Sequence, residues 1–336
     1  MISIATGLAS DGLRGMKTPT LEVRVHRKIE EALGICTFEL VSADGSTLPA
    51  FSAGSHVDVE LPGGLIRQYS LCNQAGETHR YVIGVLKEPN SRGGSRALHE
   101  EVMEGGSLFI SSPRNHFALV HGARNSILFA GGIGITPILC MAERLAITGE
   151  RFSLHYSTRS PERTAFVDRI QASAFSPQVQ FHFDDGPDVQ KLDMNAVLAA
   201  PSAGTHLYVC GPQGYMEAVL GAARALGWLE DQLHYEFFGA APVKSDADAS
   251  FQVKLASSGR VITIPSDKTV VQALDEAGMS IMTSCEQGVC GTCLTRVLEG
   301  EPDHRDIYLT PEEQARNDQF MPCCSRAKSS LLVLDL

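Results

Sequence analysis

The chain has 336 residues, of which 43% are hydrophobic and 20% are charged, and its formal net charge is −11 at pH 7. A chain of this length should form two or three domains. The acidic balance argues against nucleic acid as a partner, and no apolar run is long enough to span a membrane. Residues 1–18 have no hydrophobic signal core and are typical of a flexible tail, so we expect a cytoplasmic, reducing environment.

Residues 19–118 alternate short hydrophobic runs with turn residues. The runs at 20–25 and 56–61 have strand periodicity, and glycine-containing turns stand at 43–45 and 62–64. Short strands separated by such turns predict a small antiparallel β-barrel.

Two motifs in this segment could bind a phosphorylated ring cofactor. In the first, Arg67 could neutralise a phosphate, Tyr69 could pack on a ring, and Ser70 could hydrogen-bond the reactive edge of that ring. The second, at 91–96, has two glycines, a capping serine and two arginines before an expected helix at 97–103, which makes an anion site. For both motifs the alternative is a strand end or a surface turn without a ligand.

Residues 119–238 change to an alternation of strand and helix. Strands are expected at 126–130, 152–156 and 207–210, and a helix is expected at 137–148 after a glycine turn. Such alternation predicts a parallel sheet with helices on both faces.

The glycine turn at 131–134 is a candidate nucleotide site. Glycines let a pyrophosphate approach the backbone, and the following helix offers free N–H groups; Thr136 could cap this helix and Pro137 suits its first position. The spacing is not G-x-G-x-x-G, so the ordinary dinucleotide fingerprint does not strictly apply. A second signal is C-G-P at 210–212, at the end of a later strand where ligands of parallel sheets gather, although Cys210 could equally be a small buried residue.

Residues 239–250 are small, polar and unperiodic, which is typical of a linker. The remaining residues, 251–336, predict an α+β domain of the β-grasp type. Its expected elements are a hairpin at 251–255 and 261–264, a helix at 270–277, a second helix started by a capping box at Thr310 with Pro311 at its first position, and a closing strand at 331–334.

The most specific feature of the chain is a cysteine motif near its end. Cys285, Cys290 and Cys293 have the spacing C-x₄-C-x₂-C, and Cys323 follows after 29 intervening residues. This is the plant-type spacing for a [2Fe–2S] cluster, and we expect Cys324 to be a neighbour that does not bind iron. Zinc sites usually present two paired-ligand knuckles, and nine cysteines without a secretory signal do not suggest a disulfide framework.

A nicotinamide site and an iron–sulfur cluster in one chain require an intermediary. The nucleotide gives up two electrons as a hydride, whereas the cluster accepts one electron. A flavin can accept the pair and release the electrons singly, so the barrel segment is expected to hold a flavin. Each motif alone could be a strand end or a turn that binds no ligand. Because the motifs support one another, this alternative is much weaker for all of them together.

In combination and in order, these motifs resemble the phthalate dioxygenase reductase and vanillate demethylase reductase family. The resemblance covers nearly the whole chain after about residue 19 and is carried by R-Q-Y-S-L-C-N at 67–73, G-G-S at 93–95, A-G-G-I-G-I-T-P at 130–137, C-G-P at 210–212 and S-C-E-Q-G-V-C-G-T-C at 284–293. The segments at 303–306 and 331–336 match as well. Any one motif also belongs to wider groups of flavoprotein reductases or ferredoxins.

The resemblance implies FMN, a [2Fe–2S] cluster and NADH, each with its own set of residues. FMN would be held by Phe238 together with the barrel residues Arg67, Gln68, Tyr69, Ser70, Gly84, Val85, Leu86, Lys87, Gly93, Gly94 and Ser95. NADH would be held by Gly131, Gly132, Gly134, Thr136, Pro137, Ser157, Arg159, Cys210, Gly211 and Pro212. The cluster ligands would be Cys285, Cys290, Cys293 and Cys323. The catalytic candidates are Ser70, which would lie near flavin N5, Thr136 and Cys210.

The choice of nucleotide is less specific. The family often has an acidic residue shortly after the arginine that matches Arg159, where this chain has Ser160 and then Glu162. This departure weakens a decision between NADH and NADPH from this region. NADH is favoured because members of the family use it.

The resemblance implies an electron-transfer reductase that takes hydride from NADH and passes single electrons to a separate Rieske-type oxygenase. The oxygenase would act on a phthalate-like or methoxybenzoate-like aromatic acid, and the reductase would be a monomer. One alternative is an FAD reductase of similar layout that serves a monooxygenase or a cytochrome. Another is a ferredoxin-like carrier or sensor without turnover, and a zinc-stabilised interaction protein is a remote third.

Overall fold

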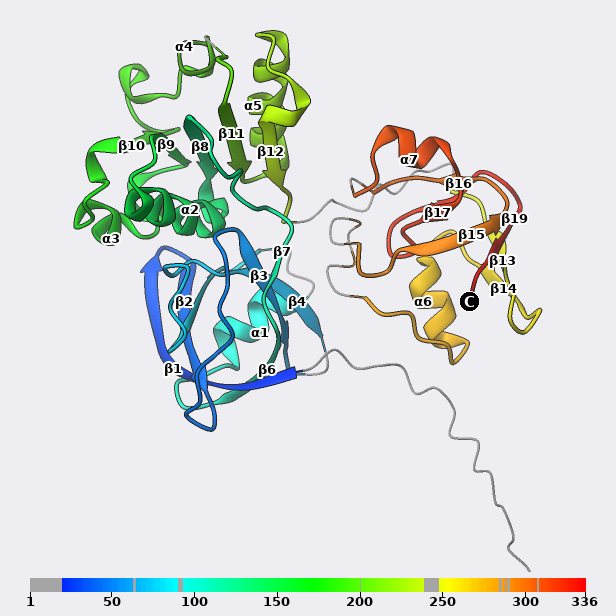
Figure 1. Ribbon diagram of the computed structural model, residues 1–336. Coiled ribbons are helices and arrows are strands. Elements are labelled where there is room, and N and C mark those ends of the chain that lie inside the picture. The colour runs from blue at the N-terminus through cyan, green and yellow to red at the C-terminus, as the bar shows by residue number, and fades with distance from the viewer. Residues whose placement is uncertain are drawn as a thin grey trace, which may run out of the picture.

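Three units of structure follow one another along the chain (Figure 1). The computed structural model describes residues 20–62, 65–89, 93–199, 201–238, 248–283, 286, 288, 291–306 and 308–336. The tail expected at 1–18 and residues 239–247 of the expected linker lie outside the described residues. Within the described part of the chain, no helix has the length and apolar character needed to cross a bilayer.

The first unit is an antiparallel β-barrel, as expected. Its strands are β1 (Thr20–Ala32), β2 (Ile35–Ser42), β3 (Ser55–Glu60), β4 (Ile66–Ser70), β5 (Tyr81–Leu86), β6 (Ser107–Ser111) and β7 (Arg114–Asn115). They are arranged in the order β4-β3-β6-β1-β2-β5, with β7 beside β3. A bridge between Leu71 and Ile83 brings the chain after β4 against β5, so the two ends of this order meet.

Alternating side chains fill the interior of the barrel. Val57 and Val59 of β3 are fully buried, whereas Asp58 between them is partly exposed and pairs with Arg114. Burying a valine or leucine side chain contributes about 1.5–3 kcal/mol, so this alternation fixes which face of each strand points inward.

Helix α1 (Gly94–Glu100) covers part of the barrel and begins earlier than the expected 97–103. The N–H of Ala97 already donates to the carbonyl oxygen of Gly93 at 2.9 Å. The glycines before Ala97 therefore belong to the first turn and its cap. They do not form a separate loop.

The second unit has the expected five-stranded parallel sheet, in the order β10-β9-β8-β11-β12. Its elements are β8 (Asn125–Gly131), α2 (Ile135–Thr148), β9 (Phe152–Thr158), α3 (Val167–Gln171), β10 (Val179–Phe183), α4 (Met194–Leu198), β11 (Thr205–Cys210), α5 (Gln213–Ala225) and β12 (Leu233–Glu236). Buried side chains of α2 and α5 lie in two separate hydrophobic clusters, one for each helix. Helices thus cover both faces of the sheet.

The start of α2 differs from the expectation. A 3₁₀ turn (Gly132–Gly134) leads directly into the helix, which begins at Ile135 with Gly134 as its N-cap. The Thr136 hydroxyl donates to the carbonyl oxygen of Ile133 at 3.1 Å. The expectations that Thr136 caps the helix and that Pro137 is its first residue are therefore wrong, because the preceding turn already has helical geometry.

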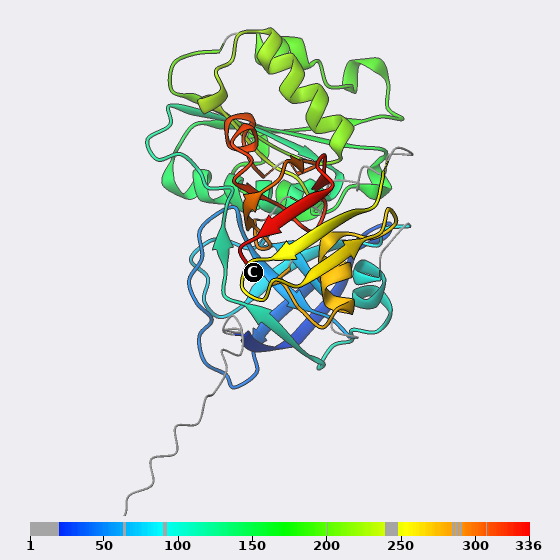
Figure 2. The same cartoon turned by 90° about the vertical axis from the view of Figure 1, so that its right-hand side faces the viewer.

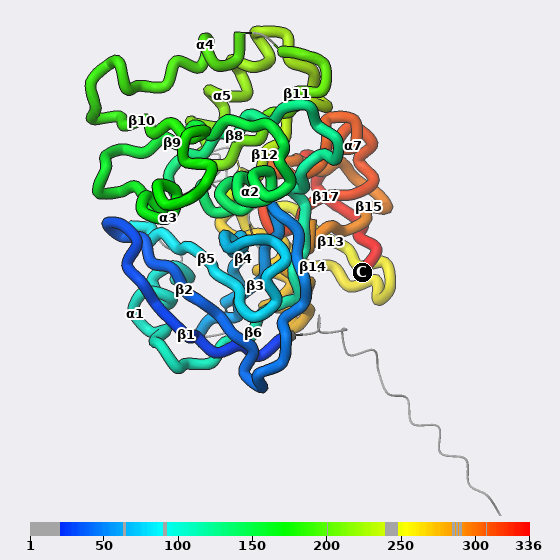
Figure 3. The backbone as a smooth tube through the Cα atoms, turned by 60° about the vertical axis from the view of Figure 1, so that its left-hand side comes forward, coloured from blue at the N-terminus to red at the C-terminus, as the bar shows by residue number. Residues whose placement is uncertain are grey.

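The barrel and the parallel sheet share one hydrophobic cluster. It combines Ile35, Cys72 and Val82 of the barrel with Ile138 and Met141 of α2. Figures 1 and 3 show α2 and α3 between the sheet and the barrel. This shared core fixes the carboxyl ends of the parallel strands next to β4 and β5.

The third unit is the expected α+β domain. Its elements are β13 (Phe251–Leu255), β14 (Val261–Ile264), α6 (Val270–Glu276), β15 (Thr295–Glu299), β16 (Pro302–Asp303), α7 (Pro311–Ala315), β17 (Gln319–Phe320), β18 (Arg326–Ala327) and β19 (Leu331–Leu334). The sheet order is β14-β13-β19-β15-β17, with β13 and β19 parallel. Capping boxes start both helices, at Thr269 and at Thr310. Figure 2 shows this domain lying across the junction between the other two units.

Candidate flavin, nucleotide and cluster sites

Three strand ends from two units meet at one place. Ser70 ends β4 of the barrel, Cys210 ends β11, and Glu236 ends β12 as the register partner of Cys210. The Ser70 hydroxyl donates to Glu236 Oε2 at 3.4 Å. Burial, together with the nearby Glu236 carboxylate, raises the pKa of the Cys210 thiol well above its usual value. Cys210 is thus a neutral, fully buried thiol beside the barrel.

A histidine pair behind Ser70 was missed by sequence reasoning. His56 Nδ1 lies 3.7 Å from Glu236 Oε1, and its Nε2 lies 3.2 Å from the side-chain amide of Gln68. The rings of His56 and His116 are 5.5 Å apart, and burial, followed by the charges of His56 and Arg114, lowers the pKa of His116. Sequence reasoning also missed Glu236. Its position could have been found from the sequence, because it ends a strand at the carboxyl edge of a parallel sheet.

The glycines of the nucleotide motif have different roles. A Cβ at Gly134 would lie 2.2 Å from the Cys210 carbonyl oxygen, and a Cβ at Gly211 would lie 2.9 Å from the Gly131 Cα. These glycines let the two turns at the ends of β8 and β11 pack backbone against backbone. Gly132, with φ of +51°, has open space where its Cβ would stand. It is therefore the glycine in this turn where a ligand can approach the backbone.

The catalytic candidate Thr136 faces the barrel. A Cβ on Gly84 of β5 would lie 2.8 Å from Thr136 Cγ2, and Thr136 is 1% exposed. Beyond Gly84, the buried Val85 points into the barrel core, while Lys87 pairs with Glu100 at 2.9 Å. These two side chains therefore point away from Thr136, whereas Leu86 packs against the cluster that the barrel shares with α2.

The two flavin motifs of the barrel come together in space. A Cβ on Gly94 would lie 2.7 Å from Arg67 Cγ, so the arginine stem lies directly on the start of α1. The Ser95 hydroxyl accepts the N–H of Glu88 at 3.1 Å. Tyr69 packs against the barrel core, and its burial raises the pKa of its hydroxyl. A cationic side chain thus lies beside a glycine turn, which suits a phosphate.

The remaining nucleotide candidates lie around the same sheet edge. The Ser157 hydroxyl donates to the Tyr215 hydroxyl at 3.4 Å, and Arg159 is exposed at the end of β9. Pro212 is the N-cap residue of α5. Phe238 follows β12 and is 43% exposed.

The described part of the cluster motif is tightly packed. Cys293 and Cys323 are 2% and 3% exposed and share a buried cluster with Met321 and Cys324. Cys285 and Cys290 lie outside the described residues. A Cβ on Gly288, where φ is +72°, would lie 2.4 Å from Cys324 Sγ. Gly288 therefore lies directly against Cys324, at a position where a left-handed backbone without a side chain is required.

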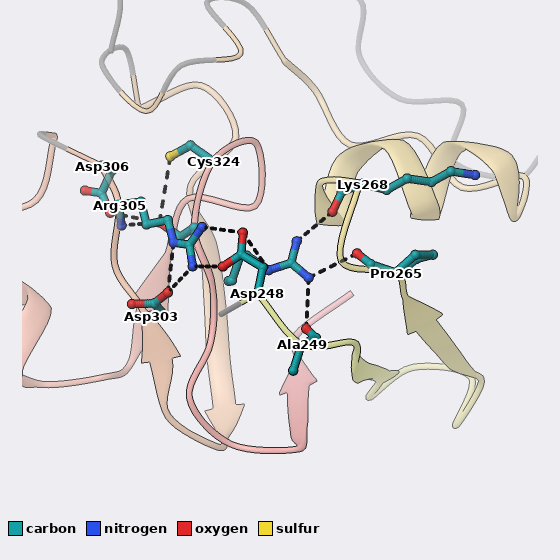
Figure 4. Close-up of polar contacts among 10 residues, drawn as sticks. Asp248, Ala249, Pro265, Lys268, Asp303, Arg305, Asp306 and Cys324 are labelled. Carbon is teal, nitrogen blue, oxygen red and sulfur yellow. Dashed lines mark hydrogen bonds and ion pairs between the residues drawn. The ribbon is translucent and has the colours of Figure 1, made fainter. Parts of the chain in front are cut away.

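The beginning of the third unit is fixed by two arginines (Figure 4). Arg305 binds Asp248 with two nitrogens, at 3.0 and 2.5 Å, and Asp303 at 2.7 Å. These hydrogen bonds, first the one to Asp248, raise the pKa of the guanidinium. Arg326 donates to the carbonyl oxygens of Ala249, Pro265 and Lys268. Side-chain hydrogen bonds therefore tie Asp248 and Ala249, at the end of the linker, to the cluster domain.

Comparison with known proteins agrees with this geometry. Residues 253–328 match the model of the 2Fe-2S iron-sulfur cluster binding domain. A vanillate O-demethylase oxidoreductase of Pseudomonas sp. strain HR199 is 58% identical over 305 residues, which are 91% of this chain and 96% of that protein. The chain belongs to the phthalate dioxygenase reductase and vanillate demethylase reductase family. This confirms the resemblance seen in the sequence.

Solved structures place this family member among modular reductases. A phthalate dioxygenase reductase, described as a modular structure for electron transfer from pyridine nucleotides to [2Fe-2S], is 40% identical with a TM-score of 0.77, covering 94% of this chain and 98% of that one. An intact type IV self-sufficient cytochrome P450 monooxygenase is 37% identical with a TM-score of 0.79, but the match covers 41% of that longer chain. The three-unit fold expected from the sequence is confirmed.

Proposed function

We propose that this protein is the NADH-dependent FMN and [2Fe–2S] reductase of an oxygenase system. The observation that carries the proposal is the meeting of Ser70, Cys210 and Glu236 at the junction of barrel and parallel sheet. It provides one place where the reactive edge of a flavin and a nicotinamide could face each other. The family supports the same chemistry, since its members are named as oxidoreductases and reductase subunits.

The residues present fit FMN. Arg67 lies over the Gly94 backbone, where a side chain larger than hydrogen would collide with it, and this provides a compact cationic phosphate site. When bound, FMN accepts a hydride and releases electrons one at a time. Ser70 would hydrogen-bond the reactive edge of the ring, and Glu236 would hold the serine hydroxyl in one direction. Phe238, which is exposed next to this place, would cover the ring.

The nucleotide would bind at the edge formed by β8 and β11. The open position above Gly132 allows a pyrophosphate to approach the backbone. The buried, neutral thiol of Cys210 offers a small apolar wall that adds no charge where hydride moves. The protein's contribution is thus alignment and exclusion of water, without a proton-transferring residue in the hydride step.

Four thiolates, Cys285, Cys290, Cys293 and Cys323, would hold the [2Fe–2S] cluster. The electrons would leave to a separate Rieske-type oxygenase, with the reductase acting as a monomer. The identity of 58% to vanillate O-demethylase oxidoreductases, against 40% to phthalate dioxygenase reductase, favours a methoxybenzoate-like aromatic acid as the substrate of that oxygenase.

A haem partner is the second candidate, because the module also matches the type IV self-sufficient cytochrome P450. The two candidates differ in the acceptor and not in the reductase chemistry. Mixing the reductase with a vanillate-type Rieske oxygenase or with a free P450 haem domain, and measuring substrate-dependent oxygen uptake, separates them.

The test of the proposed reductase chemistry is an anaerobic NADH titration followed in the visible spectrum, with the released flavin identified by chromatography. We expect bleaching of both flavin and iron–sulfur bands and release of FMN. Release of FAD would show that the protein is instead an FAD reductase of similar layout. A preparation that NADH does not bleach would refute electron transfer from NADH.

The flavin site has a more local test. Replacing Arg67 with Ala should lower the FMN content of the purified protein while the iron content stays unchanged, since Arg67 lies in the barrel and not among the cysteines. The variant Arg24→Ala, at an exposed position of β1 in the same barrel, is the matched control. Unchanged flavin content in the Arg67 variant would refute the phosphate role of this residue.

A further inference from the structure

One ion pair connects the cluster loop to the barrel. Glu286, which follows Cys285 directly in the chain, places its Oε2 atom 3.5 Å from Nη1 of Arg67 in β4. The two residues are 219 positions apart and belong to different units. The contact therefore reports where the cluster loop lies relative to the proposed flavin phosphate site.

The barrel fixes the position of Arg67. Its stem lies on Gly94, where an added Cβ would be 2.7 Å from Arg67 Cγ, and its Nη1 also donates to the Ile66 carbonyl oxygen at 2.7 Å. Its side chain is only 14% exposed. A guanidinium held in this way offers a charged point of fixed position to an approaching loop.

Glu286 occupies its place at a conformational cost. Its φ of +56° lies in the left-handed region, which glycine and asparagine adopt more readily than glutamate. Backbone preference thus gives no reason for glutamate here. The charge of its side chain does give a reason, because the carboxylate is the atom group that meets Arg67.

We propose that the Glu286–Arg67 ion pair docks the cluster loop on the barrel and thereby sets the distance for electron transfer from flavin to cluster. Because Glu286 is bonded to the expected ligand Cys285, moving its carboxylate away from Arg67 displaces the cluster side of the loop. The inference rests on the proposed function, since it assigns a flavin to the barrel. It makes Arg67 a residue that serves both the phosphate and the docking of the neighbouring domain.

The strength of such a pair determines what to measure. Glu286 is 42% exposed, so the interaction is screened by salt and shifts a docking equilibrium by no more than about fivefold. A loss of overall stability is therefore not expected. The expected effect is on the second electron-transfer step and on the spread of domain positions.

The experiment uses Glu286→Gln and Glu286→Lys, because changing Arg67 would also disturb the flavin. Glu312→Gln is the matched control, since Glu312 is an exposed carboxylate in the first turn of α7 in the same domain. Iron, sulfide and FMN contents establish that each variant is loaded. Anaerobic stopped-flow mixing with saturating NADH then resolves flavin reduction from cluster reduction, and small-angle X-ray scattering gives the radius of gyration.

We expect unchanged flavin reduction in all variants. Cluster reduction should slow by up to about fivefold in Glu286→Gln, which removes the ion pair, and by more in Glu286→Lys, whose ammonium group also repels Arg67. The radius of gyration should be larger for the lysine variant. The control should match the wild type in both measurements. Wild-type cluster reduction and an unchanged radius of gyration in both Glu286 variants would overturn the proposal.

A salt series on the wild-type protein keeps the proposal testable if the Glu286 variants fail to hold a cluster. Raising the sodium chloride concentration should slow cluster reduction but not flavin reduction, and a cluster rate independent of salt would overturn the docking role. Failure of the proposed function has a different signature, because the wild-type cluster would then not be reduced by NADH at any salt concentration.

Discussion

In the nucleotide-binding unit, the candidate site residues come from strand ends that are far apart in the chain. In the ferredoxin domain, three of the four expected cluster ligands follow one another in one loop. The first arrangement is held by backbone packing, as the close approach of Gly134 to the Cys210 carbonyl shows. The second would be held by bonds from the cysteine sulfurs to the cluster, and ion pairs around Asp248 support the same domain. Single substitutions should therefore act through different atoms in the two regions.

The cysteines should give the largest effect. Replacing Cys323 with Ser should abolish the cluster, because a serine oxygen does not replace a thiolate ligand well. The variant Cys324→Ser should keep the cluster, since Cys324 Sγ lies under Gly288 and donates to the Met321 carbonyl oxygen at 3.7 Å. Visible spectra and iron content decide between the two, and the reverse pattern would show that the ligand assignment is wrong.

In the nucleotide-binding unit, the corresponding test adds a single methyl group to a glycine. Gly134→Ala should lower the free energy of unfolding by about 3–5 kcal/mol, because its Cβ would meet a backbone oxygen that cannot rotate away. Gly214→Ala is the control, since a Cβ there has open space and α5 favours alanine over glycine. Urea unfolding followed by Trp228 fluorescence reports on this unit, because Trp228 is the single tryptophan and is buried there. Equal stability of the two variants would contradict the packing argument.

The ion pairs of the ferredoxin domain should have a smaller effect. Arg305→Ala should destabilise this domain by about 2–3 kcal/mol, because it leaves the nearly buried carboxylate of Asp248 without its two-nitrogen partner. Arg316→Ala removes an exposed arginine and should cost less than about 1 kcal/mol. Thermal bleaching of the cluster band measures both. Similar bleaching temperatures for the two variants would mean that the Arg305–Asp248 ion pair does not stabilise the domain.

The smallest effect is a pH dependence confined to the parallel sheet. Burial, followed by the charge of His182, lowers the pKa of His155 to about 4. The native state therefore binds this proton less readily than the unfolded chain does. The stability contributed by neutral His155 is fully present above about pH 6.5 and is lost as the pH falls towards 4. His155→Phe, which keeps a ring stacked on Phe129, should reduce this loss by an amount on the order of 2 kcal/mol.

Urea unfolding at pH 7.5 and at pH 5, read from Trp228, tests the His155 prediction. The wild type should lose more stability between the two pH values than the variant does. Val189→Phe, at an exposed position of the same unit, removes no titratable group, so it is the control and should leave the difference unchanged. An identical pH dependence in the wild type and in the His155 variant would refute the assignment of this stability loss to protonation of His155.

Local features of the chain were read correctly from sequence because their causes lie within a few residues. The hairpin β13–β14 and the helix starts at Thr269 and Thr310 have the expected positions. The strand β19 matches its expected range as well. By contrast, the expected cap at Thr136 was wrong, since the helical turn before it depends on how Gly134 packs against β11.

The sequence by itself determined the three kinds of unit, the family and the cysteine spacing, because periodicity, capping and ligand spacing are local properties of the chain. Only the tertiary structure placed Glu236 beside Ser70, turned Thr136 towards Gly84 and brought Glu286 to Arg67. Each of these contacts joins residues from different elements. Their existence depends on where distant strands end and on how the units dock, which no spacing within one segment encodes.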